Sequence, residues 1–265
     1  MIKLIASDID GTLIKDSTPD LYPEMVKAIK ALIGQGIIFC AASGRQYDSI
    51  KNVFRSIEED IVFIAENGAQ IRYREKDISV TPMNREYAEE IIRQLREYGR
   101  TCDIVVSTPN GCLLESRNKE FIDLITYGYR NKFTLVKDVL EEDSQIIKVS
   151  IYQKEGIREL GEEILIPRWK DKVKACMAGE EWVDFMDASV DKGHALAFVQ
   201  EYFNIQKEET MAFGDNHNDI GMMRAAGESY AVETARTEVK NAAKYICPSY
   251  LEKGVYQVVK GLINA

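Results

Sequence analysis

The stretch IKLIASDIDGTLI, residues 2–14, begins as an apolar run and ends in a polar turn. An apolar run of this length, rich in isoleucine and bounded by a glycine, predicts a strand that is buried on both faces of a sheet. Two carboxylates, Asp8 and Asp10, stand one residue apart where the run ends. Neighbouring anions repel each other, so the stretch raises the question of what offsets their charge.

Short apolar runs alternate with segments of helical periodicity along both flanks of the chain. In the first helical segment, Val26, Ile29 and Ile33 are predicted to share one face. Continuous apolar strands separated by helices predict a parallel sheet covered on both faces, and therefore an α/β fold. The expected strands are IKLIA (2–6), GIIFCAA (36–42), IVFIAENG (61–68), ETMAFGD (209–215) and SYAVE (229–233), and the expected helices are 23–36, 46–57, 192–203, 219–226 and the C-terminal segment.

The middle of the chain has a different pattern. The helix candidates REYAEEIIRQLREY and NKEFIDLITYGYR are interleaved with strands in which polar residues alternate more freely, namely CDIVVST, IIKVSIYQ, KVKACMAG and EWVDFMD. This pattern predicts an α+β insert of about 100 residues, large enough for a core of its own. The aromatic residues Phe121, Tyr127 and Tyr129 are expected to pack in that core rather than contact a substrate. We therefore predict a core of residues 1–83 and 186–265 and an inserted domain of residues 84–185.

The composition argues against several classes of partner. The chain has 265 residues, of which 45% are hydrophobic, and a net charge of -9, which argues against binding to nucleic acid or to an anionic membrane. Its five cysteines are scattered and never spaced as CxxC, which favours a reducing compartment over a disulfide framework or a structural zinc site. No apolar run is long enough for a signal peptide or a membrane span. We expect a soluble, cytoplasmic protein, and the sequence does not predict its oligomeric state.

Polar side chains follow the predicted core strands where these strands end. Asp8 and Asp10 follow the first strand, and Asp215 and Asp219 follow the strand ETMAFGD. Because parallel sheets bind ligands at the carboxyl ends of their strands, these carboxylates should meet at one edge. Four carboxylates in one place require a cation, and an all-oxygen set of ligands suits Mg²⁺. The sequence therefore predicts a magnesium site.

Three further groups predict a phosphate ligand beside that metal. A hydroxyl at Ser43, a backbone amide at Gly44 and an ammonium at Lys192 are groups that hold a phosphate dianion. The Asp8 carboxylate can attack phosphorus and form an aspartyl phosphate, which water then cleaves. Asp10 can give a proton to the departing alkoxide or take one from the attacking water.

Four motifs carry a resemblance to a known family: DIDGTL (8–13), SGR (43–45), DKG (191–193) and GDNHND (214–219). In this order they resemble the motifs of the haloacid dehalogenase superfamily of phosphatases. ENGAQI after the third strand and EKGVYQVVKGLI near the end are similar to its Cof-type branch, the capped sugar-phosphate phosphatases with a type IIB cap. The resemblance implies a Rossmann-like parallel-sheet core and an inserted cap that closes over the site.

The resemblance also implies a role for each matching residue. Asp8 would be the nucleophile and Asp10 the general acid/base. The side chains of Asp8 and Asp215 and the backbone carbonyl of Asp10 would bind Mg²⁺, while Asp219 would act through a water or orient Lys192. The residues that would hold the phosphate are Ser43, Gly44, Lys192 and Asn218.

Several of these residues also have a purely structural interpretation. An isolated DxDG is usually a solvated acidic turn, but four motifs in order at strand ends and helix starts favour a functional site. A calcium-binding loop beginning at residue 215 would need glycine and glutamate where the chain has Ile220 and Ala226, so that alternative fails. Arg45 can reach either the ligand or a neighbouring carboxylate. His217 is expected in a solvated loop rather than at the edge of the pocket.

Three functions remain open from the sequence. The leading one is a Mg²⁺-dependent phosphoric monoester hydrolase that acts on a small phosphorylated metabolite, with sugar phosphates as the expected class. The second is a sugar phosphomutase that uses the same aspartyl phosphate. The third is a phospho-acceptor without turnover, which is disfavoured because receiver domains are much shorter and place the accepting aspartate in mid-chain, whereas Asp8 is near the start.

Overall fold

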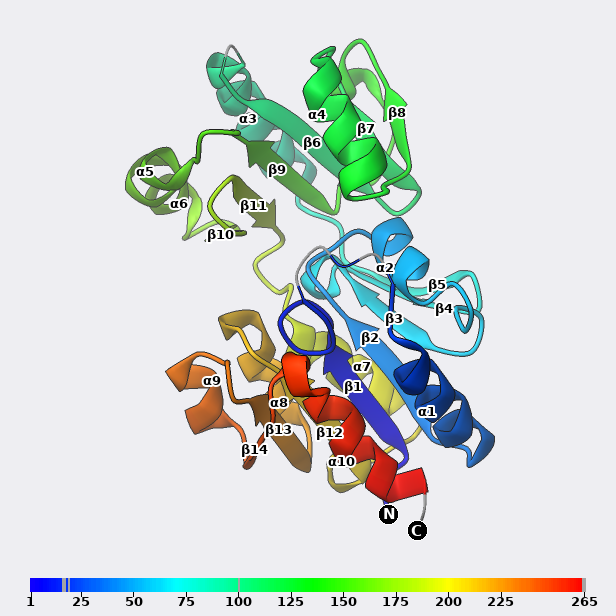
Figure 1. The fold of residues 1–265 in the computed structure, drawn as a ribbon. Coiled ribbons are helices and arrows are strands. Elements are labelled where there is room, and N and C mark those ends of the chain that lie inside the picture. The colour runs from blue at the N-terminus through cyan, green and yellow to red at the C-terminus, as the bar shows by residue number, and fades with distance from the viewer. Residues whose placement is uncertain (16–17, 19, 100, 264–265) are drawn as a thin grey trace. The chain divides into compact units, whose positions relative to one another are not determined.

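The computed structural model describes residues 1–15, 18, 20–99 and 101–263, and the chain divides into two compact units (Figure 1). The core unit consists of Met1–Ser79 and Asp191–Ala265, and the inserted unit consists of Val80–Val190. The chain therefore leaves the core unit once, builds the inserted unit from one continuous segment, and returns.

The core unit is built on one sheet, which has eight strands in the described part of the chain. The strand order is β14-β13-β12-β1-β2-β3-β4-β5, in which all neighbours from β14 to β3 are parallel and β4 is antiparallel to β3. This arrangement confirms the predicted α/β fold. The strands are β1 (Leu4–Asp8), β2 (Ile38–Ala42), β3 (Val62–Ala65), β4 (Gln70–Tyr73), β5 (Lys76–Val80), β12 (Thr210–Gly214), β13 (Glu228–Val232) and β14 (Tyr245–Cys247).

Helices cover the core sheet, with α1 and α10 on the near side of the sheet and α7 behind it in Figure 1. Helix α1 packs against α10, and α7 packs against α8. The buried side chains of strands and helices form one continuous hydrophobic cluster. The helices are α1 (Pro23–Gly34), α2 (Tyr47–Val53), α7 (Lys192–Tyr202), α8 (Ile220–Ala225), α9 (Thr237–Ala242) and α10 (Gly254–Ile263).

The three residues predicted to share a face of α1 are buried to different depths. Ile29 is fully buried, but Val26 and Ile33 are only partly buried at the margin of the core. The face that packs against the sheet is centred on Ile29 and Leu32 and includes Met25 and Ala28. All three predicted residues therefore contact the core from one face of α1, which confirms the prediction, and Val26 and Ile33 lie at the edge of that face.

The inserted unit is an α+β structure around a second sheet. In the described residues this sheet has six strands in the order β10-β11-β9-β6-β7-β8, antiparallel except for β7 and β8. The two sheet faces bury separate hydrophobic clusters, since Val105 and Val106 of β6 belong to different clusters. The elements are α3 (Arg85–Leu95), β6 (Asp103–Thr108), β7 (Gly111–Leu114), α4 (Lys119–Asp123), β8 (Phe133–Leu135), β9 (Lys148–Tyr152), α5 (Arg158–Leu160), α6 (Ile166–Trp169), β10 (Lys174–Met177) and β11 (Trp182–Met186).

A helical run from Arg158 to Trp169 was not predicted from the sequence. It contains Gly161 and Pro167, both of which lower helix propensity. The structure gives Gly161 a packing role, since a Cβ there would lie 2.6 Å from the sulfur of Met177 on β10. The missing side chain therefore lets the helical run lie close to the sheet.

The aromatic residues of the α4 region are only partly as predicted. Phe121 is buried and stacks on Tyr152, and Tyr129 packs edge-on against Trp182, which confirms core packing for both. Tyr127 is 75% exposed, so the prediction for this residue was wrong.

Within the described residues, no helix is both long enough and apolar enough to cross a membrane.

Candidate active site

The first predicted catalytic residue, Asp8, lies at the end of a central strand of the core sheet. Asp8 is the last residue of β1, and its neighbours in the sheet are β12 on one side and β2 on the other. Parallel pairing aligns the carboxyl ends of these strands, so the segments after β1, β2 and β12 leave the sheet at the same edge. Asp8 itself is only 6% exposed.

The turn after β1 is shaped to approach the segment that follows β12. Gly11 has a φ of +82°, and a Cβ at this position would lie 2.7 Å from Oδ2 of Asp215. The Thr12 hydroxyl donates a hydrogen bond of 2.9 Å to Oδ1 of Asp215. Glycine is therefore required at residue 11 both by its backbone conformation and by the close approach of the carboxylate.

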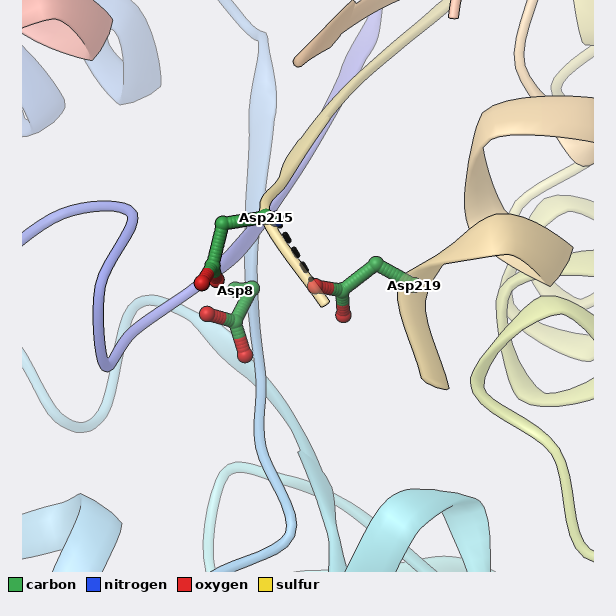
Figure 2. A group of neighbouring side chains, drawn as sticks. All are labelled: Asp8, Asp215 and Asp219. Carbon is green, nitrogen blue, oxygen red and sulfur yellow. Dashed lines mark hydrogen bonds between the residues drawn. The ribbon is translucent and has the colours of Figure 1, made fainter. Parts of the chain in front are cut away.

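Three carboxylates meet at this edge (Figure 2). Asp8, Asp215 and Asp219 each offer an oxygen, and these oxygens lie within 4.8 Å of one another. Asp8 and Asp219 are buried, and Asp215 is partly buried. The structure thus brings together three of the four carboxylates that the sequence predicted at a metal site.

A single buried ammonium links two of these carboxylates. Lys192, the first residue of α7, has a side chain with 0% exposure, and its Nζ donates to Oδ1 of Asp8 at 2.6 Å and to Oδ1 of Asp219 at 2.7 Å. The other oxygen of Asp219 accepts the backbone N–H groups of Asp215 and Asn216, both at 3.0 Å. Both oxygens of Asp219 are therefore engaged in holding Lys192 and the loop after β12.

The charges of the cluster shift the proton affinity of its members. Burial raises the pKa of Asp8 well above its usual value, and the charge of Asp219 raises it further, whereas Lys192 opposes both effects. Burial and Asp219 likewise raise the pKa of Asp215 to about 6, against the hydrogen bond from Thr12. Burial lowers the pKa of Lys192, but the charges of Asp219 and Asp8 outweigh it and the net shift is upward. The three carboxylates therefore carry more negative charge than the ammonium of Lys192 offsets.

Three of the predicted phosphate-binding residues, Ser43, Gly44 and Asn218, lie in the segments that follow β2 and β12. Ser43 and Gly44 directly follow β2, and Ser43 is 2% exposed. Asn218 donates a hydrogen bond of 2.8 Å to the side-chain oxygen of Asn67, which follows β3. A Cβ at Gly44 would lie 3.2 Å from the Asn67 amide group, so these residues pack closely together.

Asp10 does not join the carboxylate cluster with its side chain. Its two oxygens accept hydrogen bonds from Arg45, from Nε at 2.6 Å and from Nη2. Arg45 thus reaches a neighbouring carboxylate, one of the two contacts expected for it. His217 is half-exposed and lies 3.5 Å from Glu238, in agreement with the solvated loop that was expected.

The profile of the haloacid dehalogenase-like hydrolase family matches residues 5–259, which is nearly the whole chain. The chain belongs to this family. The superfamily predicted from the four motifs is thereby confirmed, and so is the prediction that the chain is an enzyme of the hydrolase class.

Individual proteins are similar to this hydrolase over their full length. The 5-amino-6-(5-phospho-D-ribitylamino)uracil phosphatase YbjI of Escherichia coli (strain K12) is 26% identical over 263 residues, which cover 99% of this chain and 97% of the relative. A crystal structure of a protein from Eubacterium rectale superimposes with a TM-score of 0.89 at 37% identity and covers 98% of this chain and 99% of that one. The subclass IIB sugar phosphatase BT4131 superimposes with a TM-score of 0.81 at 23% identity, covers 98% of both chains, and shares the fold.

The residues of the hydrolase fit a divalent metal ion. Oδ2 of Asp8 is buried and has no hydrogen-bond partner, which is costly for a carboxylate oxygen. It lies in a group whose other ligand atoms are also carboxylate oxygens, the ligands that Mg²⁺ prefers. Three carboxylates against the one ammonium of Lys192 leave an excess of negative charge that a divalent cation offsets.

Three residues of this site make contacts that the sequence did not assign. Thr12 holds Asp215, Asn67 contacts Asn218, and Arg45 contacts Asp10. All three stand within motifs that the sequence had singled out, DIDGTL, ENGAQI and SGR. Their position at strand ends was the available signal, but the spacing in the sequence does not tell which side chain turns toward which partner.

Proposed function

We propose that the hydrolase is a Mg²⁺-dependent phosphatase that cleaves small phosphorylated metabolites through an aspartyl phosphate. The observation that carries this proposal is the state of Asp8, a buried carboxylate with Oδ1 held by Lys192 and Oδ2 without a hydrogen-bond partner. A carboxylate that is fixed at one oxygen and open at the other is suited to react with a ligand rather than to stabilise the fold.

In this proposal Asp8 attacks the phosphorus atom of the ester and Asp10 gives a proton to the leaving oxygen. Water then attacks the aspartyl phosphate, and its proton passes to Asp10. Splitting one displacement into two lets the same carboxyl group serve as acid and then as base. Lys192 keeps Asp8 oriented through its short hydrogen bond.

The phosphate group needs several donors to be held for attack. We assign this task to Ser43, Gly44, Lys192 and Asn218, which offer a hydroxyl, a backbone amide, an ammonium and a side-chain amide. Ser43 and Lys192 are both nearly inaccessible to solvent, so their interactions with a bound anion act in a low-dielectric surrounding.

The side chains of Asp8 and Asp215 and the backbone carbonyl of Asp10 would hold Mg²⁺. When bound, the ion would supply positive charge to the phosphoryl oxygens. Asp219 has both oxygens engaged with Lys192 and with two backbone amides, which favours an orienting role over direct binding of the metal.

For the substrate we propose phosphate esters of sugars or sugar alcohols. A relative that matches nearly the whole chain is named as a phosphatase of a phosphorylated ribityl compound, and such a compound is a polyhydroxyl phosphate ester.

We further propose that residues 1–83 and 186–265 carry the catalysis and that residues 84–185 form a cap that selects the leaving group. We also propose that the enzyme is cytoplasmic. All five cysteines are free thiols, which supports a reducing compartment.

The test is release of inorganic phosphate from a panel of sugar and sugar-alcohol phosphates, with Mg²⁺ or with EDTA. We compare the wild type with Asp8→Asn, which keeps the shape of the side chain, and with Asp143→Asn, a matched change at an exposed aspartate. The expected result is metal-dependent release by the wild type and Asp143→Asn and no release by Asp8→Asn.

Two outcomes would contradict the proposal. Substantial activity of Asp8→Asn would exclude this residue as the nucleophile. Interconversion of phosphate positions without release of phosphate would replace the phosphatase by a phosphomutase.

A further inference from the structure

Arg45 and Asp10 form a two-point ion pair beside the carboxylate cluster. Nε of Arg45 donates to Oδ2 of Asp10 at 2.6 Å, and Nη2 donates to Oδ1. The two side chains are 18% and 24% exposed. Within the part of the chain that the structure describes, these are the hydrogen bonds of the Asp10 carboxylate, so one edge of the guanidinium determines how the carboxylate is oriented.

The backbone fixes the point from which the Arg45 side chain starts. The N–H of Arg45 donates to the Ser43 hydroxyl at 3.1 Å, and its carbonyl accepts the N–H of Glu66 at 2.9 Å. Arg45 is therefore tied to its own strand end and to the end of the next strand. A long side chain that starts from a fixed backbone loses less conformational freedom when it forms a defined contact.

The Asp10 end of the pair is fixed in a similar way. The N–H of Gly11 donates to the carbonyl of Ile14, and the N–H of Leu13 donates to the carbonyl of Ile9 at 2.9 Å. These bonds close a tight turn around residue 10. Because the backbone at residue 10 is fixed in this way, the remaining freedom of Asp10 lies in its side chain. The contact with Arg45 then determines where the carboxylate points.

We propose that Arg45 is the positioning residue for Asp10. The guanidinium fixes the direction of the Asp10 carboxyl group, so that the oxygen that carries the transferred proton faces the leaving group in a defined direction. This inference rests on the proposed function, in which Asp10 is the general acid and base. A fixed orientation matters for that role because proton transfer requires the donor and acceptor to lie at hydrogen-bond distance in a defined direction.

The role of Arg45 does not change the balance of the reaction. In the first step a bond forms between Asp8 and phosphorus, the ester bond breaks, and the Asp10 proton moves to the leaving oxygen. In the second step a water oxygen binds phosphorus, the bond to Asp8 breaks, and a proton of the water moves to Asp10. Arg45 keeps its protons throughout.

The test compares two esters that differ in their need for an acid. The phenolate of p-nitrophenyl phosphate leaves without a proton, whereas an alkyl phosphate needs one. We measure kcat/KM, which reports the steps up to formation of the aspartyl phosphate, for p-nitrophenyl phosphate and for the better substrate of glucose 6-phosphate and ribose 5-phosphate. The variants are Arg45→Met, Arg45→Lys and Asp10→Asn.

The expected result is selective for the alkyl ester. Arg45→Met should lower kcat/KM for the sugar phosphate by about 10²-fold, in the range of a lost general acid, and change p-nitrophenyl phosphate by less than about 5-fold. Asp10→Asn should show the same selectivity. Arg45→Lys, which keeps the charge but not the two-point geometry, should recover part of the loss.

A double mutant separates positioning from other roles. If Arg45 acts through Asp10, Arg45→Met in the Asp10→Asn background should cause little further loss for the sugar phosphate. An additive loss, or an equal loss for both esters, would overturn the inference and assign Arg45 to phosphate binding or to the fold. Because the pair is partly exposed, Arg45→Met is not expected to unfold the protein, and its melting temperature is compared with that of Arg55→Met, at an exposed ion pair with Asp20.

The proposed function can fail independently. A wild type that hydrolyses neither ester would reject the phosphatase itself. Normal wild-type activity together with unselective Arg45 variants would reject only the positioning role.

Discussion

The ammonium of Lys192 lies 2.6 Å from the carboxylate of Asp8, although 184 positions separate the two residues in the chain. The inserted unit accounts for much of this separation, because it occupies Val80–Val190 and the chain returns to the core unit directly before Lys192. Asp8 ends the central strand and Lys192 begins a helix, so two rigid elements hold the pair. Rigid support of this kind is what a reactive carboxylate requires.

Replacing Lys192 tests the importance of this contact. Lys192→Met keeps most of the volume but leaves Asp8 and Asp219 buried without the ammonium, which is expected to cost about 3–5 kcal/mol of stability in metal-free protein. Phosphate release should fall by at least about 10²-fold, because a fixed donor is lost. The measurements are thermal unfolding in EDTA and phosphate release, with Lys170→Met at an exposed position as the control. Unchanged stability and activity would show that the contact is dispensable.

Removing one carboxylate of the cluster tests the metal site. Mg²⁺ should raise the melting temperature of the wild type, since a ligand that binds only the folded state at about 100 times its dissociation constant adds about 2.7 kcal/mol. Asp215→Asn should remove most of this shift, while its amide oxygen still accepts the hydrogen bond from Thr12. The check is thermal unfolding with and without Mg²⁺. A full shift in Asp215→Asn would place the metal elsewhere.

The location of the site could be predicted from the sequence because it depends on topology. Asp8 ends its parallel strand, Ser43 and Asp215 directly follow theirs, and neighbouring parallel strands end at the same edge. The pairing of side chains could not be predicted in the same way. Whether Arg45 turns to the ligand or to Asp10 depends on rotamers and on the turn at Gly11, and neither has a periodic signal in the sequence.

The elements missed in the fold are short or lack regular periodicity. The strands β7, β8 and β14 have only three or four residues, too few for an alternating pattern to be distinguished from a loop. The hairpin between β4 and β5 turns at Arg74 and Glu75, both with positive φ, where glycine or asparagine is the usual signal. In both cases tertiary packing decides the structure rather than local preference.

Alkaline pH should destabilise the protein through its buried tyrosines. Burial, and to a smaller extent the charge of Glu75, raises the pKa of Tyr47 to about 12, whereas the pKa of an exposed tyrosine is about 10. The folded state therefore keeps a proton that the unfolded state loses, so this contribution is complete below about pH 10 and is lost as the pH rises to about 12. Urea unfolding at about pH 9 and about pH 11 should show a smaller loss of stability for Tyr47→Phe than for the wild type. Equal losses would contradict the assignment.

Two glycines in helices should respond in opposite directions to alanine. A Cβ at Gly193, next to Lys192 in α7, would lie 2.4 Å from the backbone carbonyl carbon of Gly221 in α8, so the two helices would have to separate. Gly193→Ala should therefore lower the free energy of unfolding by about 1–3 kcal/mol and lower phosphate release, because Lys192 moves with its helix.

At Gly261 in α10 a Cβ would meet nothing within 4 Å. Gly261→Ala should raise the free energy of unfolding by about 0.5–1 kcal/mol through lower entropy of the unfolded chain. Urea unfolding of both variants checks the signs. A neutral Gly193→Ala would mean that contact between α7 and α8 does not position the lysine.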